Sequence, residues 1–365
     1  GYQQEFGRIG MQINDSLTTD DWMEVYKKLV YWEIELENSQ VPMTDMLRMQ
    51  KQKANNAFGK FVKKNYVDWI QHPEIRPLMS PDLFKKKVFP MLDNGDKVFF
   101  ILIDNFRLDQ WREVKDLLAE YYTFDESLYY SIPPTATQYA RNSIFSGLMP
   151  LQIEKMFPEL WVDEDSEEGK NLNEAPLIQT QIERFRKKYT FSYHKVHDSQ
   201  YNDKLLNIVP SLLHNQLNVV VLNFVDMLSH ARTENKMIRE LAQSEAAYRS
   251  LTRSWFQHSG TLELFKRIAG KRYKVIVTTD HGTIGVDNPE KVIGDKNTNT
   301  NLRYKVGKNL NYNPKDVFDI RFPDKAGLPS PNLSSKYIFA MNNDFFAYPN
   351  NYNYYVSYYK NTFQH

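Results

Sequence analysis

The sequence of 365 residues contains no cysteine. This excludes disulfide bonds, thiolate-bound zinc and cysteine nucleophiles, and it is compatible with a reducing cytoplasm, the location that we expect. Net charge is also nearly lacking, because 46 lysine and arginine residues balance 45 aspartate and glutamate residues. No global field therefore marks the chain as a binder of duplex DNA or of a membrane surface. The longest apolar runs are too short to span a bilayer, so we expect no membrane partner.

The composition that remains is that of a globular protein, with 41% hydrophobic and 25% charged residues. A chain of this length can bury one large core, or a core and a helical appendage. The first part lacks strand signals. Thr18 to Asp21 supply helix-cap candidates before a segment whose apolar residues recur at helical spacing. The sequence predicts a helical bundle or adaptor over residues 1–80.

From Lys97 onward, apolar runs typical of strands alternate with helical segments such as 109–121 and 202–215. This alternation predicts an α/β fold over residues 81–365, with a mainly parallel sheet flanked by helices.

Three further segments interrupt or end this pattern. Insertions are expected near 151–190 and 285–335, and the acidic stretch 161–176 is expected to be exposed. The aromatic-rich segment 336–359 predicts a pair of strands.

Three β-branched, apolar runs end on an acid, at Asp104, Asp226 and Asp280, and His230 and His281 follow the last two. In an open α/β sheet, ligands gather outside the carboxyl ends of the strands, so these side chains are expected to converge. Carboxylates a few Å apart resist joint ionisation unless a cation lies among them. The sequence therefore predicts a metal site, and the number of ligand-type residues favours two ions.

Each acid also has a structural interpretation, because aspartate often ends strands and caps the following turn. Asp226 and His230 are more specific, since a spacing of four places both on one face of a helix. Asp280 and His281 are adjacent, but the strand ends there and Gly282 allows the backbone to bend. Zinc accepts imidazole nitrogen and carboxylate oxygen, and manganese or iron would accept the same ligands.

The segment from Ser131 to Gly147 offers a nucleophile. A helix beginning near Gln138 places Thr135 or Thr137 at its N-terminus, where free N–H groups favour a phosphate oxygen. Metal coordination is one route by which a threonine hydroxyl is activated. The structural alternative is that both threonines only cap the helix.

In their order along the chain, these residues resemble the alkaline phosphatase superfamily. Asp104 stands on the first core strand, a threonine starts the next helix, two Asp–His pairs follow, and His365 ends the sequence. The segment TQYARNSIFSG has the spacing of the family's nucleophile helix, with Arg141 four residues on and a closing glycine. This spacing favours Thr137 over Thr135.

The resemblance implies a hydrolase of phosphoric esters with two zinc ions. One ion would be held by Asp104, Thr137, Asp280 and His281, and the other by Asp226, His230 and His365. Thr137 would attack phosphorus and form a phospho-threonine intermediate, with Arg141 in contact with the phosphate. A threonine nucleophile resembles the nucleotide pyrophosphatase/phosphodiesterase branch, which favours a nucleotide or oligonucleotide phosphodiester. The alternatives are a phosphomonoesterase, or a metal-stabilised module that acts through dimerisation or protein contacts.

Within the superfamily the pattern looks most like the PglZ domain. The helical segment in front resembles PorX-type response regulators of Bacteroidota, which control type IX secretion. In those regulators a receiver domain precedes the helical bundle and the PglZ-like domain. The resemblance implies that this chain is the output part of a larger cytoplasmic protein that forms a homodimer, with a histidine kinase as its partner.

Overall fold

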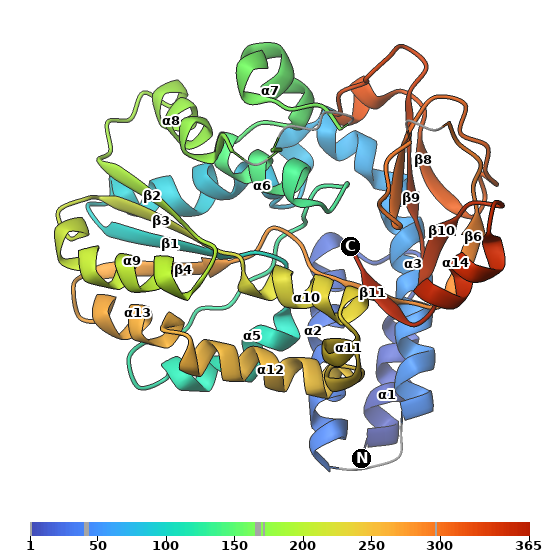
Figure 1. Ribbon diagram of the computed structural model, residues 1–365, viewed down its shortest axis with the longest axis horizontal. Helices are drawn as coiled ribbons and strands as arrows, with labels where there is room; N and C mark the ends of the chain where they lie inside the picture. The colour runs from blue at the N-terminus through green and yellow to red at the C-terminus, as the bar shows by residue number, and fades with distance from the viewer. Residues whose placement is uncertain (1, 40–43, 165–168, 171, 296–297) are drawn as a thin grey trace. The chain divides into compact units, whose positions relative to one another are not determined.

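The computed structural model describes residues 2–39, 44–164, 169–170, 172–295 and 298–365. Two compact units are present (Figure 1). Residues 1–77 and 284–365 form the first unit, and residues 78–283 form the second. The second unit contains all three strands that precede the predicted acids.

The centre of the second unit is a sheet of four parallel strands in the order β2–β3–β1–β4. The strands are β1 (Lys97–Ile103), β2 (Phe191–Val196), β3 (Leu217–Leu222) and β4 (Tyr273–Thr278). Ile101 of β1 lies opposite Val220 of β3 and Val277 of β4. Every residue of β3 is buried, as continuous apolar runs in a covered parallel sheet require. The predicted α/β fold with a mainly parallel sheet is confirmed.

Helices cover both faces of this sheet (Figure 1). The α-helices of the second unit are α4 (Phe89–Asp93), α5 (Leu108–Val114), α6 (Thr137–Ser146), α7 (Pro150–Met156), α8 (Glu174–Arg184), α9 (Ser199–Leu212), α10 (Phe224–Glu234), α11 (Lys236–Leu241), α12 (Glu245–His258) and α13 (Thr261–Ile268). Side chains of β1 alternate between the faces. Phe99 belongs to the core formed with α5, α9, α12 and α13, whereas Phe100 packs against Phe84 and against Phe145 of α6.

The first unit begins with three helices, α1 (Tyr2–Gln12), α2 (Thr19–Ser39) and α3 (Thr44–Gln71). Their shared core includes Phe6, Ile9, Trp22, Val25 and Leu29. Thr18 accepts a hydrogen bond from the Asp21 N–H, so the cap predicted for α2 is present. Further along α3, Tyr66 is buried and packs edge-on against Phe318, 6.0 Å away between ring centroids.

The remaining described part of the first unit includes short strands, one α-helix and the 3₁₀ helices Pro73–Ile75 and Pro323–Ala326. The strands and the α-helix are β5 (Ile284–Val286), β6 (Asn288–Lys291), β7 (Tyr304–Gly307), β8 (Val317–Ile320), β9 (Lys336–Ala340), β10 (Asp344–Ala347), α14 (Tyr352–Tyr359) and β11 (Thr362–Gln364). The prediction of one strand pair over 336–359 is wrong. Strand β9 pairs with β7 and β8, β10 pairs with β6, and the tyrosine-rich end forms α14. A turn with Asn342 at a φ of 54° separates β9 from β10.

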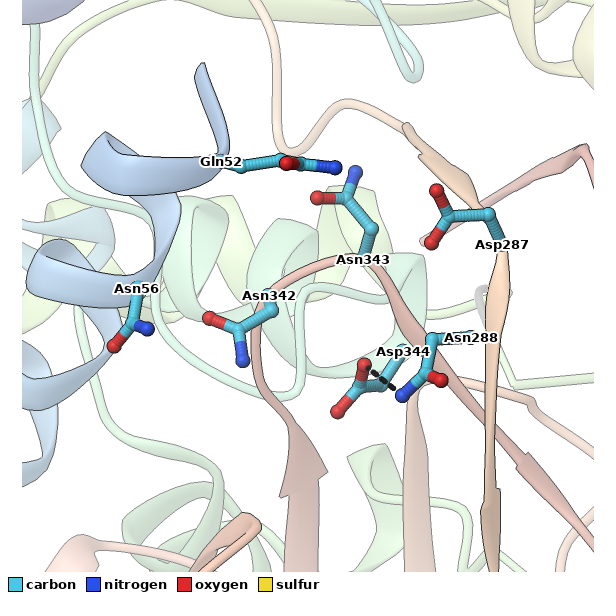
Figure 2. A pocket seen from close by; sticks show the side chains of 7 residues that line it. All are labelled: Gln52, Asn56, Asp287, Asn288, Asn342, Asn343 and Asp344. Carbon is cyan, nitrogen blue, oxygen red and sulfur yellow. Dashed lines mark hydrogen bonds between the residues drawn. The ribbon is translucent and has the colours of Figure 1, made fainter. Parts of the chain in front are cut away.

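A polar pocket of about 210 Å³ lies in the first unit (Figure 2). Its lining is made of amide and carboxylate side chains from Gln52, Asn56, Asp287, Asn288, Asn342, Asn343 and Asp344. Several of these hold the surrounding turn. The Asn343 side chain donates to the Gly285 carbonyl at 2.7 Å, and Asn288 donates to Asp344 at 2.8 Å. We call this cavity the polar pocket.

The expected exposure of 161–176 is wrong at two positions. Trp161 and Glu174 are 7% and 1% exposed, because the Trp161 ring packs against Tyr139 and the Glu174 carboxylate pairs with buried Arg141. Residues 165–168 and 171 of this stretch lie outside the described residues. No described helix is both long and apolar enough to cross a membrane.

Candidate functional site

Strands β1 and β4 deliver three ligand-type side chains to one end of the sheet. Asp104 directly follows β1, and Asp280 and His281 lie just beyond β4. The His281 Nε2 atom is 3.5 Å from Asp104 Oδ1 and 3.8 Å from Asp280 Oδ1. All three residues are buried, and one ligand atom from each lies within 4.8 Å of the others. We call Asp104, Asp280 and His281 the carboxylate cluster.

The carboxylate cluster has an acceptor that no described residue satisfies. Asp280 Oδ2 is buried and receives no hydrogen bond. Burial and the charge of Asp280 also raise the pKa of Asp104 well above its usual range. Buried polar atoms without partners are costly, and a cation among the oxygens would remove both penalties. The donor set of two carboxylates and one imidazole therefore fits a divalent metal ion such as zinc.

Arg141 of α6 is the cation that contacts this cluster. Its Nη1 atom is 3.1 Å from Asp104 Oδ2 and 3.7 Å from Asp280 Oδ2, and its Nε donates to Glu174 at 2.6 Å. Burial lowers the pKa of Arg141, but the carboxylates of Glu174, Asp104 and Asp280 raise it by more. One guanidinium cannot neutralise three carboxylates. The residue is only 1% exposed, so it lies inside the protein rather than on the helix surface.

Thr137 is the first residue of α6, and its side chain contacts the carboxylate cluster. Its Oγ1 atom lies 3.4 Å from Asp104 Oδ1 and 3.3 Å from His281 Nε2. Thr137 is half-buried, whereas Thr135 is exposed. The hydroxyl at the helix N-terminus is therefore the one placed next to the ligand-type atoms.

Asp226 and His230 form a second pair on α10. Asp226 Oδ1 and His230 Nε2 are 3.5 Å apart, as the predicted helical spacing of four requires. This pair is more open than the carboxylate cluster, since the two side chains are 21% and 52% exposed. The hydrogen bond to Asp226 raises the pKa of His230.

Asn105 is a site residue that the sequence reasoning missed. Its backbone N–H donates to Asp280 Oδ1 at 3.2 Å, and its side chain donates to Asp226 Oδ1 at 3.2 Å. It thereby connects the carboxylate cluster to the pair on α10. Its φ of 62° is left-handed, a conformation in which asparagine is several-fold enriched. The signal in the sequence is an asparagine directly after the acid that ends β1, since asparagine there favours a left-handed turn beside the site.

Gly282 lies next to His281 of the carboxylate cluster. Gly282 was expected to let the backbone bend, but the structure gives a different reason for glycine: a Cβ atom there would lie 2.9 Å from Cγ of Arg107.

His365 directly follows β11, in the first compact unit. Its role as a metal ligand stays a prediction.

A family model described as the BREX system PglZ alkaline phosphatase-like domain matches residues 83–365. The chain belongs to the PglZ family. The PorX response regulator linker domain matches residues 1–70. A search of curated proteins finds no match.

The PglZ match spans the central sheet, the carboxylate cluster, α6 and the pair on α10. The match supports a phosphoesterase-type hydrolase, and residues 1–70 are similar to the linker domain of PorX response regulators.

Proposed function

We propose that the chain is a zinc-dependent phosphodiesterase that hydrolyses a nucleotide or oligonucleotide with Thr137 as nucleophile. The observation that carries the proposal is the position of the Thr137 hydroxyl, which lies 3.4 Å from Asp104 and 3.3 Å from His281 at the start of α6. A hydroxyl beside metal-ligand atoms and a helix N-terminus is suited to attack a phosphate.

Two groups of residues would hold the metals. Asp104, Asp280, His281 and Thr137 would bind one ion, and Asp226 and His230 would bind the other, with His365 as the further ligand implied by the resemblance. When bound, the ions would supply positive charge that stabilises the phosphoryl group and lowers the pKa of a hydroxyl.

The chain's own residues would act as follows. The Thr137 oxygen forms a bond to phosphorus while the bond from phosphorus to the leaving alcohol breaks. The proton of the Thr137 hydroxyl passes through solvent to the leaving alcohol, and the other ester group stays on the phosphorus. Water then breaks the bond between Thr137 and phosphorus, which releases a phosphate monoester and restores the hydroxyl. Backbone N–H groups at the start of α6 favour the phosphate oxygens. The contact between Arg141 and the phosphate stays a prediction, and its ion pairs with Asp104 and Glu174 support a positioning role.

The first experiment compares Thr137→Ala with Thr135→Ala, a control two residues away and exposed. We expect Thr137→Ala to abolish ester hydrolysis without loss of bound zinc, and Thr135→Ala to keep both. Hydrolysis by Thr137→Ala at the original rate would refute the nucleophile. Wild-type protein with zinc added should cleave bis-p-nitrophenyl phosphate faster than p-nitrophenyl phosphate, and the opposite preference would favour a phosphomonoesterase.

The linker match at residues 1–70 supports a regulatory setting. We propose that the domain is the cytoplasmic output part of a response regulator controlled by a receiver domain and a histidine kinase, and that it acts as a homodimer. A non-catalytic signalling module is the alternative, and wild-type hydrolysis in the assay above would exclude it.

A further inference from the structure

A buried ionic network lies beside the carboxylate cluster and is not explained by the proposed chemistry. Arg107, three residues after Asp104, has a side chain that is 9% exposed. Its Nε and Nη2 atoms each donate to Asp109 at 2.9 Å, and Nη2 lies 2.7 Å from Glu245 Oε2. Because these nitrogen atoms already contact protein carboxylates, Arg107 is suited to stabilise the local structure rather than to bind a substrate.

Arg107 also contacts the segment that follows His281. Its Nη1 atom donates to the Thr283 hydroxyl at 3.3 Å, and its aliphatic part leaves no room for a side chain at Gly282. The same guanidinium thus touches the segments after β1 and after β4, which carry the three residues of the carboxylate cluster.

Glu245, the first residue of α12, extends the network to α10. Its Oε1 atom accepts from Arg232 Nη2 at 2.9 Å, while its Oε2 atom pairs with Arg107. Arg232 belongs to α10, two residues after His230, and is 3% exposed. Its guanidinium also lies 3.9 Å from the centroid of the buried Tyr248 ring. One carboxylate therefore joins the helix of Asp226 and His230 to the loops of the carboxylate cluster.

We propose that Glu245 is a positioning residue that fixes α10, and with it Asp226 and His230, relative to the carboxylate cluster. This inference rests on the proposed function, because it assumes that both groups bind metal. The contacts predict an asymmetric effect. Without Glu245, Arg107 keeps its two bonds to Asp109, whereas Arg232 on α10 loses its ion pair with the Glu245 carboxylate. The metal site on α10 is therefore the one that weakens.

The test uses Glu245→Gln and Glu245→Ala in the 365-residue chain, with Co²⁺ as the probe. Titration followed by visible absorption measures two affinities without requiring hydrolysis. We expect Glu245→Ala to weaken the Co²⁺ affinity of the site on α10 by about tenfold and to leave the affinity of the carboxylate cluster unchanged. Tenfold is the lower end of the effect that outer-shell partners have on metal affinity. Glu245→Gln keeps an acceptor and should be intermediate. If the alanine variant does not fold, the glutamine variant decides.

A second arm identifies the weakened site. In a His230→Ala background, which lacks a ligand on α10, Glu245→Gln should have no further effect on the remaining site. Glu263→Ala is the matched control, because Glu263 forms an exposed pair with Arg267 and should change neither affinity. Equal weakening of both sites, or of neither, would overturn the inference. A wild-type chain that binds two Co²⁺ ions but cleaves no ester would refute the proposed function alone.

Discussion

The carboxylate cluster and the polar pocket both bring two aspartates together, but they satisfy the oxygens differently. In the polar pocket, Asp344 accepts from Asn288 at 2.8 Å, and Asp287 lies 3.7 Å from Arg48. In the carboxylate cluster, Asp280 Oδ2 is buried and has no hydrogen-bond donor among the described residues.

This difference separates acids that stabilise a turn from acids that need a cation. In the polar pocket, the Asn288 amide donates to Asp344 and Arg48 lies near Asp287, so both carboxylates have a partner. This donor only partly offsets the desolvation of Asp344, whose pKa burial still raises. In the carboxylate cluster, Asp104 and Asp280 share Arg141, which also pairs with Glu174 outside the cluster. The number of acids in a cavity is therefore a weaker indication of a metal site than an acceptor left without a donor.

Removing Arg141 should have the largest effect on stability. Arg141→Met removes the cation beside buried Asp104 and leaves Glu174 with Lys195 at 4.0 Å, and losing one partner of a buried pair costs about 3–5 kcal/mol. We expect urea denaturation of the metal-free protein to show a loss of this size. Glu263→Gln, which removes the exposed pair with Arg267, should change the free energy of unfolding by less than about 1 kcal/mol. Equal effects of the two variants would mean that the cluster is not ionised, and the comparison would fail.

Replacing Asp104 tests whether the carboxylate cluster binds the ion. Zinc at about 100 to 1,000 times its dissociation constant should stabilise the wild-type protein by roughly 3–4 kcal/mol, because the ion binds only the folded state. Asp104→Asn removes one ligand, so the stabilisation contributed by this site should be lost. Thermal unfolding with zinc and with a chelator measures it. An undiminished zinc effect in the variant would place the metal elsewhere.

Local pattern was sufficient to predict the parts of the site that depend on one strand or one helix. Continuous apolar runs predict the buried parallel strands that bring Asp104 and Asp280 together, and a spacing of four predicts the shared helix face of Asp226 and His230. The metal-binding role of all four residues stays a prediction. Glu174 was missed because it lies in an acidic stretch expected to be exposed, and only the fold brings it to Arg141.

The same limit applies to longer-range structure. Glu245 meets Arg107 across 138 positions of the chain, a contact that no periodicity encodes. The pairing of β9 and β10 with different partners has the same origin, since strand neighbours are chosen by tertiary packing and not by adjacency in the sequence.

The smallest effect on stability is expected for Asp344→Asn in the polar pocket, the same change of aspartate to asparagine as Asp104→Asn in the carboxylate cluster. Burial raises the pKa of Asp344, so its contribution to stability is present when it is protonated and is lost as the pH rises through that raised value. At neutral pH the ionised group is a net cost. Asp344→Asn keeps an acceptor for Asn288, so we expect a gain in stability of less than about 1 kcal/mol that disappears in acid.

Urea denaturation at several pH values would measure this gain, and zinc should stabilise Asp344→Asn as much as the wild type. A loss of the zinc effect in Asp344→Asn would show that the polar pocket also binds the ion. In that case hydrogen-bonded carboxylates would be as able to hold a metal as Asp280 Oδ2, which receives no hydrogen bond from the described residues, and the distinction between the two regions would no longer stand.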